Sequence, residues 1–247
     1  KTEAEIISAI TYADENNWPV LILGGGSNIL VSDQGFHGVV IRIETEGNSY
    51  EIDSCSGGML QVSAGENWDN FVQFTLDKGL ANLESLSGIP GTVGGAPIQN
   101  IGAYGHDVSE VIARLRAYDR YEKKVTTFAA TDCEFEYRSS RFKKASGRYF
   151  ILDVTFQLRR GTESLPIAYA ELAKELGVKI GDRVDTKRVR EAVLHLRSRK
   201  GMLEGEVASA GSFFTNPIIS AELAAKLPTA APRWPQEDGR IKTSAAW

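Results

Sequence analysis

The spacing of apolar residues predicts a helix and then several short strands in the first third of the chain. A capping-box pattern, Thr2-x-x-Glu5, is followed by apolar residues at helical spacing up to Ala13. Apolar or alternating runs then predict strands at residues 19–23, 38–43, 50–53 and 60–64. A glycine-rich stretch and another apolar run, residues 29–31, follow the first of these strands without an intervening helix.

The middle of the chain predicts one helix, a long aperiodic stretch and more strands. A helix is expected to begin after Asn67 and to end at Gly79. Residues 86–105 are rich in glycine and follow neither spacing. Strands are expected again at residues 111–119 and 148–159.

Helical spacing dominates the last third of the chain. It begins at Tyr169, stops at Gly177 and returns over residues 189–196. The change from strands to helices near residue 160 predicts a domain boundary, with a first domain at residues 1–160 and a second at 161–247. We therefore expect an α+β fold with two domains.

Composition narrows the class of protein. With 247 residues, 42% hydrophobic and 24% charged, the chain can bury a sizeable core. A net charge of −4 without a basic block speaks against a nucleic-acid binder, and no apolar run approaches the roughly 18–20 residues of a membrane span. Two cysteines and three scattered histidines predict neither a disulfide framework nor a zinc site, so we expect no metal and a reduced, cytoplasmic setting. The chain begins inside a helix pattern and stops at a helix-like opening, which leads us to expect that both ends are incomplete.

Two glycine clusters are candidates for chemistry. Of the 24 glycines, one group lies at residues 24–26 and another is spread over residues 88–105. Glycine lets backbone N–H groups approach a phosphate closely. Neither cluster contains GxGxxG or a Gly-Lys-Ser/Thr sequence, so neither is a Rossmann or Walker loop. Each alone is compatible with simple turns, but the pair also fits a polyanion or dinucleotide lying between two loops.

Four blocks resemble one enzyme family. They are ILGGGSNILV at residues 22–31, GIPGTVGGAPIQNIGAYG at 88–105, EYRSSRFK at 136–143 and AGSFFTNP at 210–217. Their order and spacing resemble the UDP-N-acetylenolpyruvoylglucosamine reductases (UDP-N-acetylmuramate dehydrogenases), and the resemblance covers essentially the whole chain. It implies a two-lobed FAD-binding domain, a smaller α+β substrate domain, and NADPH-dependent reduction of UDP-N-acetylglucosamine enolpyruvate to UDP-N-acetylmuramate in peptidoglycan precursor synthesis. It also implies a monomer.

The resemblance assigns FAD contacts to both glycine clusters. They are Gly24, Gly25, Gly26, Ser27, Asn28, Ile89, Pro90, Gly91, Gly94, Gly95, Ile98, Gly102, Ala103 and Tyr104.

It also assigns two catalytic residues. Arg138 matches the family's arginine, whose planar fork can hold the substrate carboxylate while negative charge develops next to it. Ser212 matches the proton donor. Without the motif, Arg138 would be read as an ordinary surface salt bridge and Ser212 as a turn residue. The family's third catalytic residue, a C-terminal glutamate, matches no carboxylate of this chain and is expected beyond Trp247.

Substrate binding is implied for Tyr137, Tyr169, Lys200 and Asn216. Tyr169 resembles the tyrosine of the subclass whose extra loop folds over the bound nucleotide, although a helix-start aromatic is the alternative. Residues 201–204 depart from the family's Leu-Pro-Asp-Pro after the lysine, which puts Lys200 in doubt.

Two other functions compete with the reductase. One is a flavin oxidase with the same flavin domain and another substrate, and the other is a non-catalytic nucleotide-sugar or flavin-binding module. The Gly-Ser-Phe-Phe-x-Asn-Pro block favours the reductase, because in that family it belongs to the substrate side. Phe213 and Phe214 within this block are expected to pack in a core.

Overall fold

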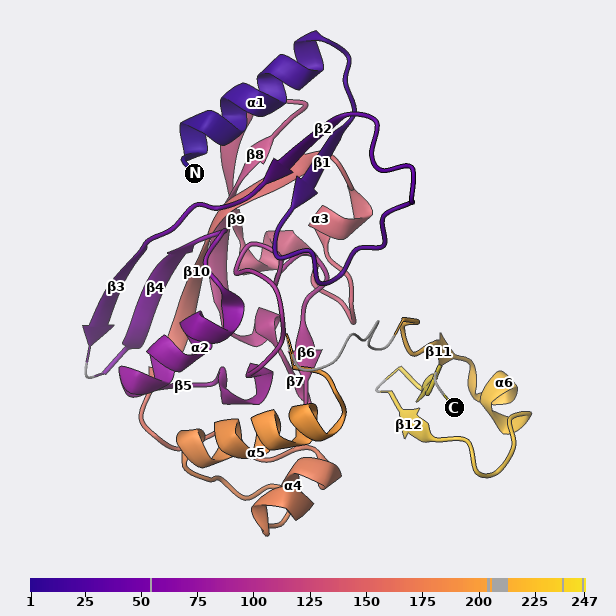
Figure 1. The fold of residues 1–247 in the computed structure, drawn as a ribbon. Coiled ribbons are helices and arrows are strands. Elements are labelled where there is room, and N and C mark those ends of the chain that lie inside the picture. Colours follow the sequence, from indigo (N-terminus) through magenta and orange to yellow (C-terminus); the bar gives the residue numbers. More distant parts are fainter. Residues whose placement is uncertain (54, 204, 206–212, 237, 246) are drawn as a thin grey trace. The chain divides into compact units, whose positions relative to one another are not determined.

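The computed structural model describes the whole chain except residues 54, 204, 206–212, 237 and 246. It divides into two compact units, Lys1–Val207 and Ala208–Trp247. The first unit carries the two glycine clusters (Figure 1).

A mixed-length antiparallel sheet forms the centre of the first unit. Its strand order is β3 (Asn48–Asp53), β4 (Gly57–Ser63), β10 (Tyr149–Arg160), β8 (Ile112–Asp119) and β9 (Lys124–Ala129), and β5 (Leu80–Ala81) also pairs with β10. Most residues of β10 are buried, because it lies between two neighbours and its sequence combines an apolar run at residues 150–152 with alternating apolar residues up to Leu158. The predicted strands at 50–53, 60–64, 111–119 and 148–159 are all confirmed in type.

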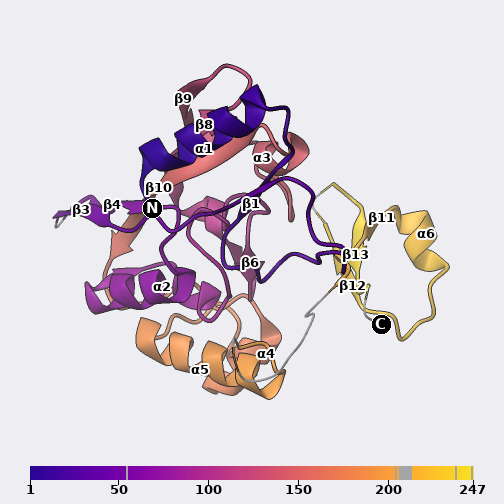
Figure 2. The same ribbon diagram turned by 45° about the horizontal axis from the view of Figure 1, so that its top comes forward.

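A parallel strand pair leads into the first glycine cluster. In it β1 (Val20–Leu23) pairs with β2 (Val39–Arg42), with Val20 opposite Val39. Helix α1 (Glu3–Glu15) precedes this pair, and its predicted capping box is confirmed by hydrogen bonds that join Thr2 and Glu5 in both directions. Helix α1 and the helices α4 and α5 lie at opposite ends of this unit (Figures 1 and 2).

Helix α2 (Trp68–Asp77) packs on the sheet and contacts the second glycine cluster, where the backbone N–H of Trp68 donates to the carbonyl of Gly91. It begins after Asn67 as predicted, Asn67 caps it, and Gly79 follows its end at φ +70°. The ring of Phe71 lies 4.8 Å from that of Phe156 on β10, and the indole of Trp68 donates to the carbonyl of Leu86 at 3.0 Å. The aperiodic stretch and the residues that flank it contain only short elements: η1 (Glu84–Leu86), β6 (Gly102–Ala103) and β7 (His106–Asp107). Further short elements are η2 (Val108–Glu110), η3 (Ala130–Cys133) and α3 (Arg141–Lys144).

Two helices follow the sheet in the first unit. They are α4 (Ala170–Leu176), which ends at Gly177, and α5 (Thr186–Arg199), which Asp185 caps. Both build a hydrophobic cluster separate from the main core. The first compact unit continues past residue 160 to Val207. The domain boundary expected near residue 160 therefore stays a prediction.

The second unit is a small α+β element. Its sheet has the order β11 (Ile218–Ile219), β13 (Ile241–Thr243) and β12 (Arg233–Pro235), and α6 (Ala221–Ala225) follows β11. The Arg233 guanidinium donates to carbonyls of Ala224 and Leu227 and so fastens the loop between α6 and β12. Phe213 and Phe214 are 66% and 69% exposed, so the expectation of core packing is wrong.

Within the described residues, no helix combines the length and apolarity needed to cross a membrane, and no group of acidic, cysteine and histidine side chains is arranged to hold a metal ion.

Candidate active site between two glycine loops

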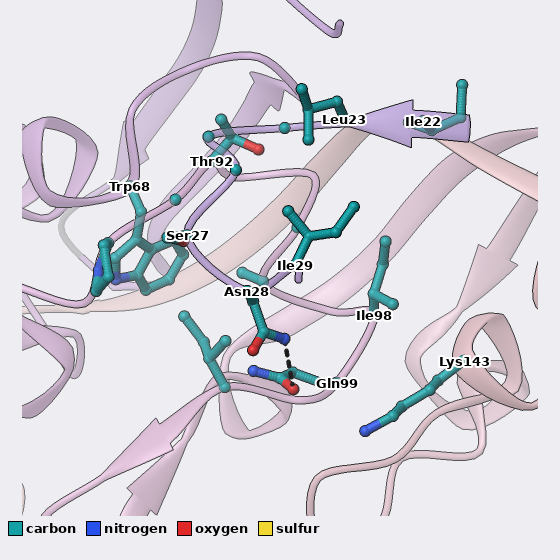
Figure 3. Close-up of a pocket in the computed structure, with 18 of the residues that line it drawn as sticks. Ile22, Leu23, Ser27, Asn28, Ile29, Trp68, Thr92, Ile98, Gln99 and Lys143 are labelled. Carbon is teal, nitrogen blue, oxygen red and sulfur yellow. Dashed lines mark hydrogen bonds between the residues drawn. The ribbon is translucent and has the colours of Figure 1, made fainter. Parts of the chain in front are cut away.

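The two glycine loops meet backbone to backbone. We call residues 24–28, directly after β1, the first glycine loop, and residues 88–105 the second. A Cβ placed on Gly25 would lie 3.0 Å from the Cα of Gly91, and one on Gly24 would lie 2.8 Å from the hydroxyl of Thr92. Only glycine permits so close an approach. Asn28 adds a hydrogen bond from its amide nitrogen to Oε1 of Gln99 at 3.1 Å (Figure 3).

Three adjoining cavities open along this contact. One of about 400 Å³ is lined by both loops, and one of about 260 Å³ shares Ile22, Gly24 and Ile98 with it and continues along β1. The third, of about 350 Å³, lies beside Gly24, Gly25 and Asn67. The first and third are within the usual range for a ligand pocket.

The lining suits a long ligand with a phosphate-bearing middle and flat aromatic ends. Backbone amides of a glycine cradle are typical phosphate partners, and aliphatic walls suit ring systems. A Cβ on Gly24 or Gly25 would clash with the second glycine loop, so glycine at both positions is what allows the two loops to approach each other. A dinucleotide therefore fits the residues present.

Most of the residues expected to contact the cofactor line these cavities. Gly24, Gly25, Gly26, Ser27, Asn28, Pro90, Gly91, Gly95 and Ile98 line the largest, and Gly94 lines the one beside it. Ile89, Gly102, Ala103 and Tyr104 line none of the three.

The largest of these three cavities is also lined by residues that the sequence analysis did not assign to the site, among them Trp68, Gln99 and Lys143. Gln99 and Lys143 belong to blocks that resemble the family, so the motif contained a signal, whereas Trp68 is a helix residue with no motif around it. Figure 3 shows Lys143 beside this cavity, and its amine donates to the backbone carbonyl of Arg138 at 3.0 Å.

Charged side chains from α2 and α5 anchor the start of the second glycine loop. Asp69 accepts from Arg190 in a bidentate pair, at 2.6 and 2.7 Å, and from the N–H of Gly88 at 2.6 Å. Burial raises the pKa of Asp69, but the bonds from Arg190 and Gly88 outweigh it and hold that pKa below its ordinary value. Arg197 donates to the carbonyl of Gly88 at 3.0 Å, and its burial lowers the pKa of its guanidinium.

Arg138 is hydrogen-bonded to the second glycine loop. Its guanidinium donates to the carbonyl of Asn100 at 3.1 Å and to that of Gly102, and it lies 5.2 Å from the ring of Tyr137. No carboxylate in the described parts of the chain forms an ion pair with it. A half-buried guanidinium held by carbonyls has positive charge left to offer an anion.

The remaining predicted residues fall in two places. Tyr169 precedes α4, and its ring meets that of Tyr104 edge-on at 5.8 Å, while Lys200 pairs with Glu171 of α4 at 2.6 Å. Asn216 belongs to the second unit, where its side-chain oxygen accepts from the N–H of Ala245 at 3.0 Å. Ser212 lies outside the described residues.

Comparison with known proteins identifies the family. Residues 1–128 match the model of an FAD-binding domain family. The UDP-N-acetylenolpyruvoylglucosamine reductase of Cutibacterium acnes is 51% identical over 250 residues, covering all of this chain and 66% of that protein. The reductase of Thermobifida fusca is 45% identical, with 98% of this chain and 72% of that protein covered. This chain belongs to the UDP-N-acetylenolpyruvoylglucosamine reductase family.

The chain is therefore part of an FAD-dependent oxidoreductase family of peptidoglycan precursor synthesis, and it spans 66% and 72% of the length of these two relatives. The crystal structure of the Thermus caldophilus enzyme matches with a TM-score of 0.59 at 23% identity, covering 88% of this chain and 66% of that one. That match concerns the fold, and it agrees with the predicted α+β flavin domain.

Proposed function

We propose that the full-length protein reduces the enolpyruvyl group of UDP-N-acetylglucosamine enolpyruvate with NADPH and forms UDP-N-acetylmuramate. The observation that carries this proposal is the guanidinium of Arg138, which forms no ion pair with a carboxylate of the described residues and is hydrogen-bonded to the glycine loop that lines the largest of the three cavities. Relatives named as this reductase at 51% and 45% identity support it. They favour the reductase over an oxidase with another substrate.

The two glycine loops would hold the FAD. Backbone N–H groups of residues 24–28 would face the diphosphate, and Lys143 would add a positive charge at the rim of the same cavity. When bound, FAD supplies the hydride-transfer chemistry. The loops position it, and the apolar side chains of Ile22 and Ile98 exclude water from its neighbourhood.

Arg138 would hold the substrate carboxylate during reduction. Hydride addition to the enolpyruvyl methylene carbon leaves negative charge on the neighbouring carbon and its carboxylate. A preorganised guanidinium stabilises that charge without having to move. A proton must then reach this neighbouring carbon from the side opposite the hydride donor, and Ser212 would donate it.

Substrate contacts would come from Tyr137, Tyr169, Lys200 and Asn216. The edge-on contact of Tyr169 with Tyr104 supports the tyrosine-loop subclass, because it fixes an aromatic side chain next to the second glycine loop. The ion pair of Lys200 with Glu171 is exposed and therefore weak, so phosphate oxygens could replace the carboxylate. Three further points remain proposals: the domain boundary at residue 160, which rests on the change from strands to helices, a cytoplasmic location, which rests on the low number of cysteines, and a monomeric state, which rests on the family resemblance.

Ser212→Ala is expected to slow turnover by about 10²–10⁴-fold, because it removes one positioned general acid. The variant should still bind the UDP-sugar and accept hydride from NADPH. Ser212→Cys should recover part of the rate, since its thiol is a more acidic donor. Steady-state turnover with a solvent-deuterium comparison measures this. Near-normal turnover by the alanine variant would mean that the proton comes from another group.

Product analysis tests the reaction as a whole. Under anaerobic conditions the full-length protein should oxidise one NADPH for each enolpyruvyl UDP-sugar consumed, and the product should be heavier by one hydride and one proton. A flavin oxidase would instead need oxygen and would form hydrogen peroxide. A binding module would consume neither compound.

A further inference from the structure

We propose that Asn100 is the positioning residue for Arg138, an inference that rests on the proposed function of Arg138. Asn100 is 2% exposed and lies in the second glycine loop. Its side-chain amide donates to the carbonyl of Glu136 at 3.2 Å, and its side-chain oxygen accepts from the N–H of Ser109 at 3.1 Å. Its backbone carbonyl accepts from Nη1 of Arg138 at 3.1 Å. One residue thus holds both the guanidinium and the backbone that carries it.

Arg138 needs such support because its backbone is strained. Its φ of +54° is unfavourable for a residue with a long side chain, and such a conformation persists only where its surroundings hold it. It lies in a tight turn in which Glu136 and Ser139 exchange backbone hydrogen bonds, both at 3.1 Å. Asn100 holds the first residue of this turn through the carbonyl of Glu136.

Asparagine suits this position for a second reason. The φ of Asn100 is +47°, and asparagine tolerates this left-handed conformation better than most residues do. The conformation lets its carbonyl face Arg138 while its side chain reaches Glu136 and Ser109. Asparagine therefore suits position 100 both by its backbone conformation and by its side-chain hydrogen bonds.

The arrangement links the cation to the flavin cleft. Ile98, Gln99 and Ile101, which lie next to Asn100 in the sequence, line the cavity of about 400 Å³. Ser140 adds a bond from its hydroxyl to the carbonyl of Ile98 at 2.5 Å, so the turn is tied to the cavity wall at a second point. Asn100 consequently sets the position of the Arg138 guanidinium relative to whatever lies in the cleft.

Asn100→Gly tests the inference, because glycine keeps the left-handed backbone and its carbonyl but loses both side-chain bonds. In the full-length holoenzyme, reoxidation of the reduced flavin by saturating enolpyruvyl UDP-sugar should slow by about 10²-fold, the typical effect of a small misplacement of a catalytic group. Reduction by NADPH and flavin affinity should stay near wild type. Asn100→Asp, which keeps the bond from Ser109 and loses the donor to Glu136, should slow the same step. Ser109→Ala keeps its N–H bond to Asn100 and is the matched control.

A double-mutant cycle separates positioning from general damage. In an Arg138→Lys background, Asn100→Gly should slow reoxidation by no more than about twofold further, because it acts through a guanidinium that is already absent. The inference would be overturned if the double variant slowed reoxidation by the product of the two single-variant effects. Normal reoxidation in a folded, flavin-loaded Asn100→Gly protein would overturn it as well. If Arg138→Lys alone leaves reoxidation unchanged, the proposed function of Arg138 fails instead, which distinguishes the two failures.

Discussion

Replacing Arg138 by lysine is expected to slow reoxidation of the reduced flavin by the enolpyruvyl UDP-sugar about 10²–10³-fold, the usual cost of losing one preorganised donor at a developing negative charge. Lysine keeps the charge, but it cannot donate to the carbonyls of Asn100 and Gly102 and grip a carboxylate with the same planar fork. Reduction by NADPH should change little, since no carbanion forms in that half-reaction. Stopped-flow absorbance resolves the two steps in the full-length protein.

Arg141→Lys provides a matched control for this experiment. Arg141 is the first residue of α3, and its guanidinium pairs with Glu134 at 2.8 Å rather than with the second glycine loop. That variant should reoxidise at nearly the wild-type rate. Equal slowing of both half-reactions in Arg138→Lys would contradict a role in charge stabilisation and would assign the residue a structural one.

Gly25→Val is expected to weaken FAD binding by about 10²-fold or more, which corresponds to the upper part of the usual cost of overpacking. Even a single Cβ at this position would lie 3.0 Å from the Cα of Gly91, and valine adds two methyl groups to that contact. The neighbouring Gly26 meets a different obstacle, because space is available there but its φ is +78°. Flavin fluorescence during titration of the apoprotein measures the affinity.

Gly181→Ala controls for a general loss of stability. Gly181 lies at φ +95° with no atom within 4 Å of an added Cβ, so alanine there strains the backbone without touching the cleft. Its flavin affinity should match that of the wild type even if its melting temperature falls. Full flavin occupancy in a folded Gly25→Val protein would contradict the placement of FAD between the loops.

The sequence predicted the local elements well because their signals are local. The caps of α1 and α2 and the apolar run of β10 depend on neighbouring residues, and each element is found where it was expected. Strand order could not be predicted, since the pairing of β10 with both β4 and β8 joins segments that are far apart in the sequence. The aperiodic second glycine loop depends on backbone contacts such as Trp68 N–H to the carbonyl of Gly91 at 3.1 Å, which leave no periodic trace.

The candidate site was predictable only as far as its motifs reach. The resemblance identified Arg138 and most of the loop residues, but it did not indicate that two carbonyls fix the guanidinium or that Asn100 joins loop and turn. Trp68 enters the cavity from α2 and has no motif around it, and only the packed structure places it there. Contacts made through tertiary structure carry no signal in a single sequence.

The visible absorption spectrum of the full-length protein during an anaerobic titration tests the central claim most directly. We expect a bound-flavin band that NADPH bleaches and that returns when UDP-N-acetylglucosamine enolpyruvate is added, but not when UDP-N-acetylglucosamine is added. A protein that purifies without flavin and binds none from solution, or a bleached band that the enolpyruvyl substrate fails to restore, would contradict it.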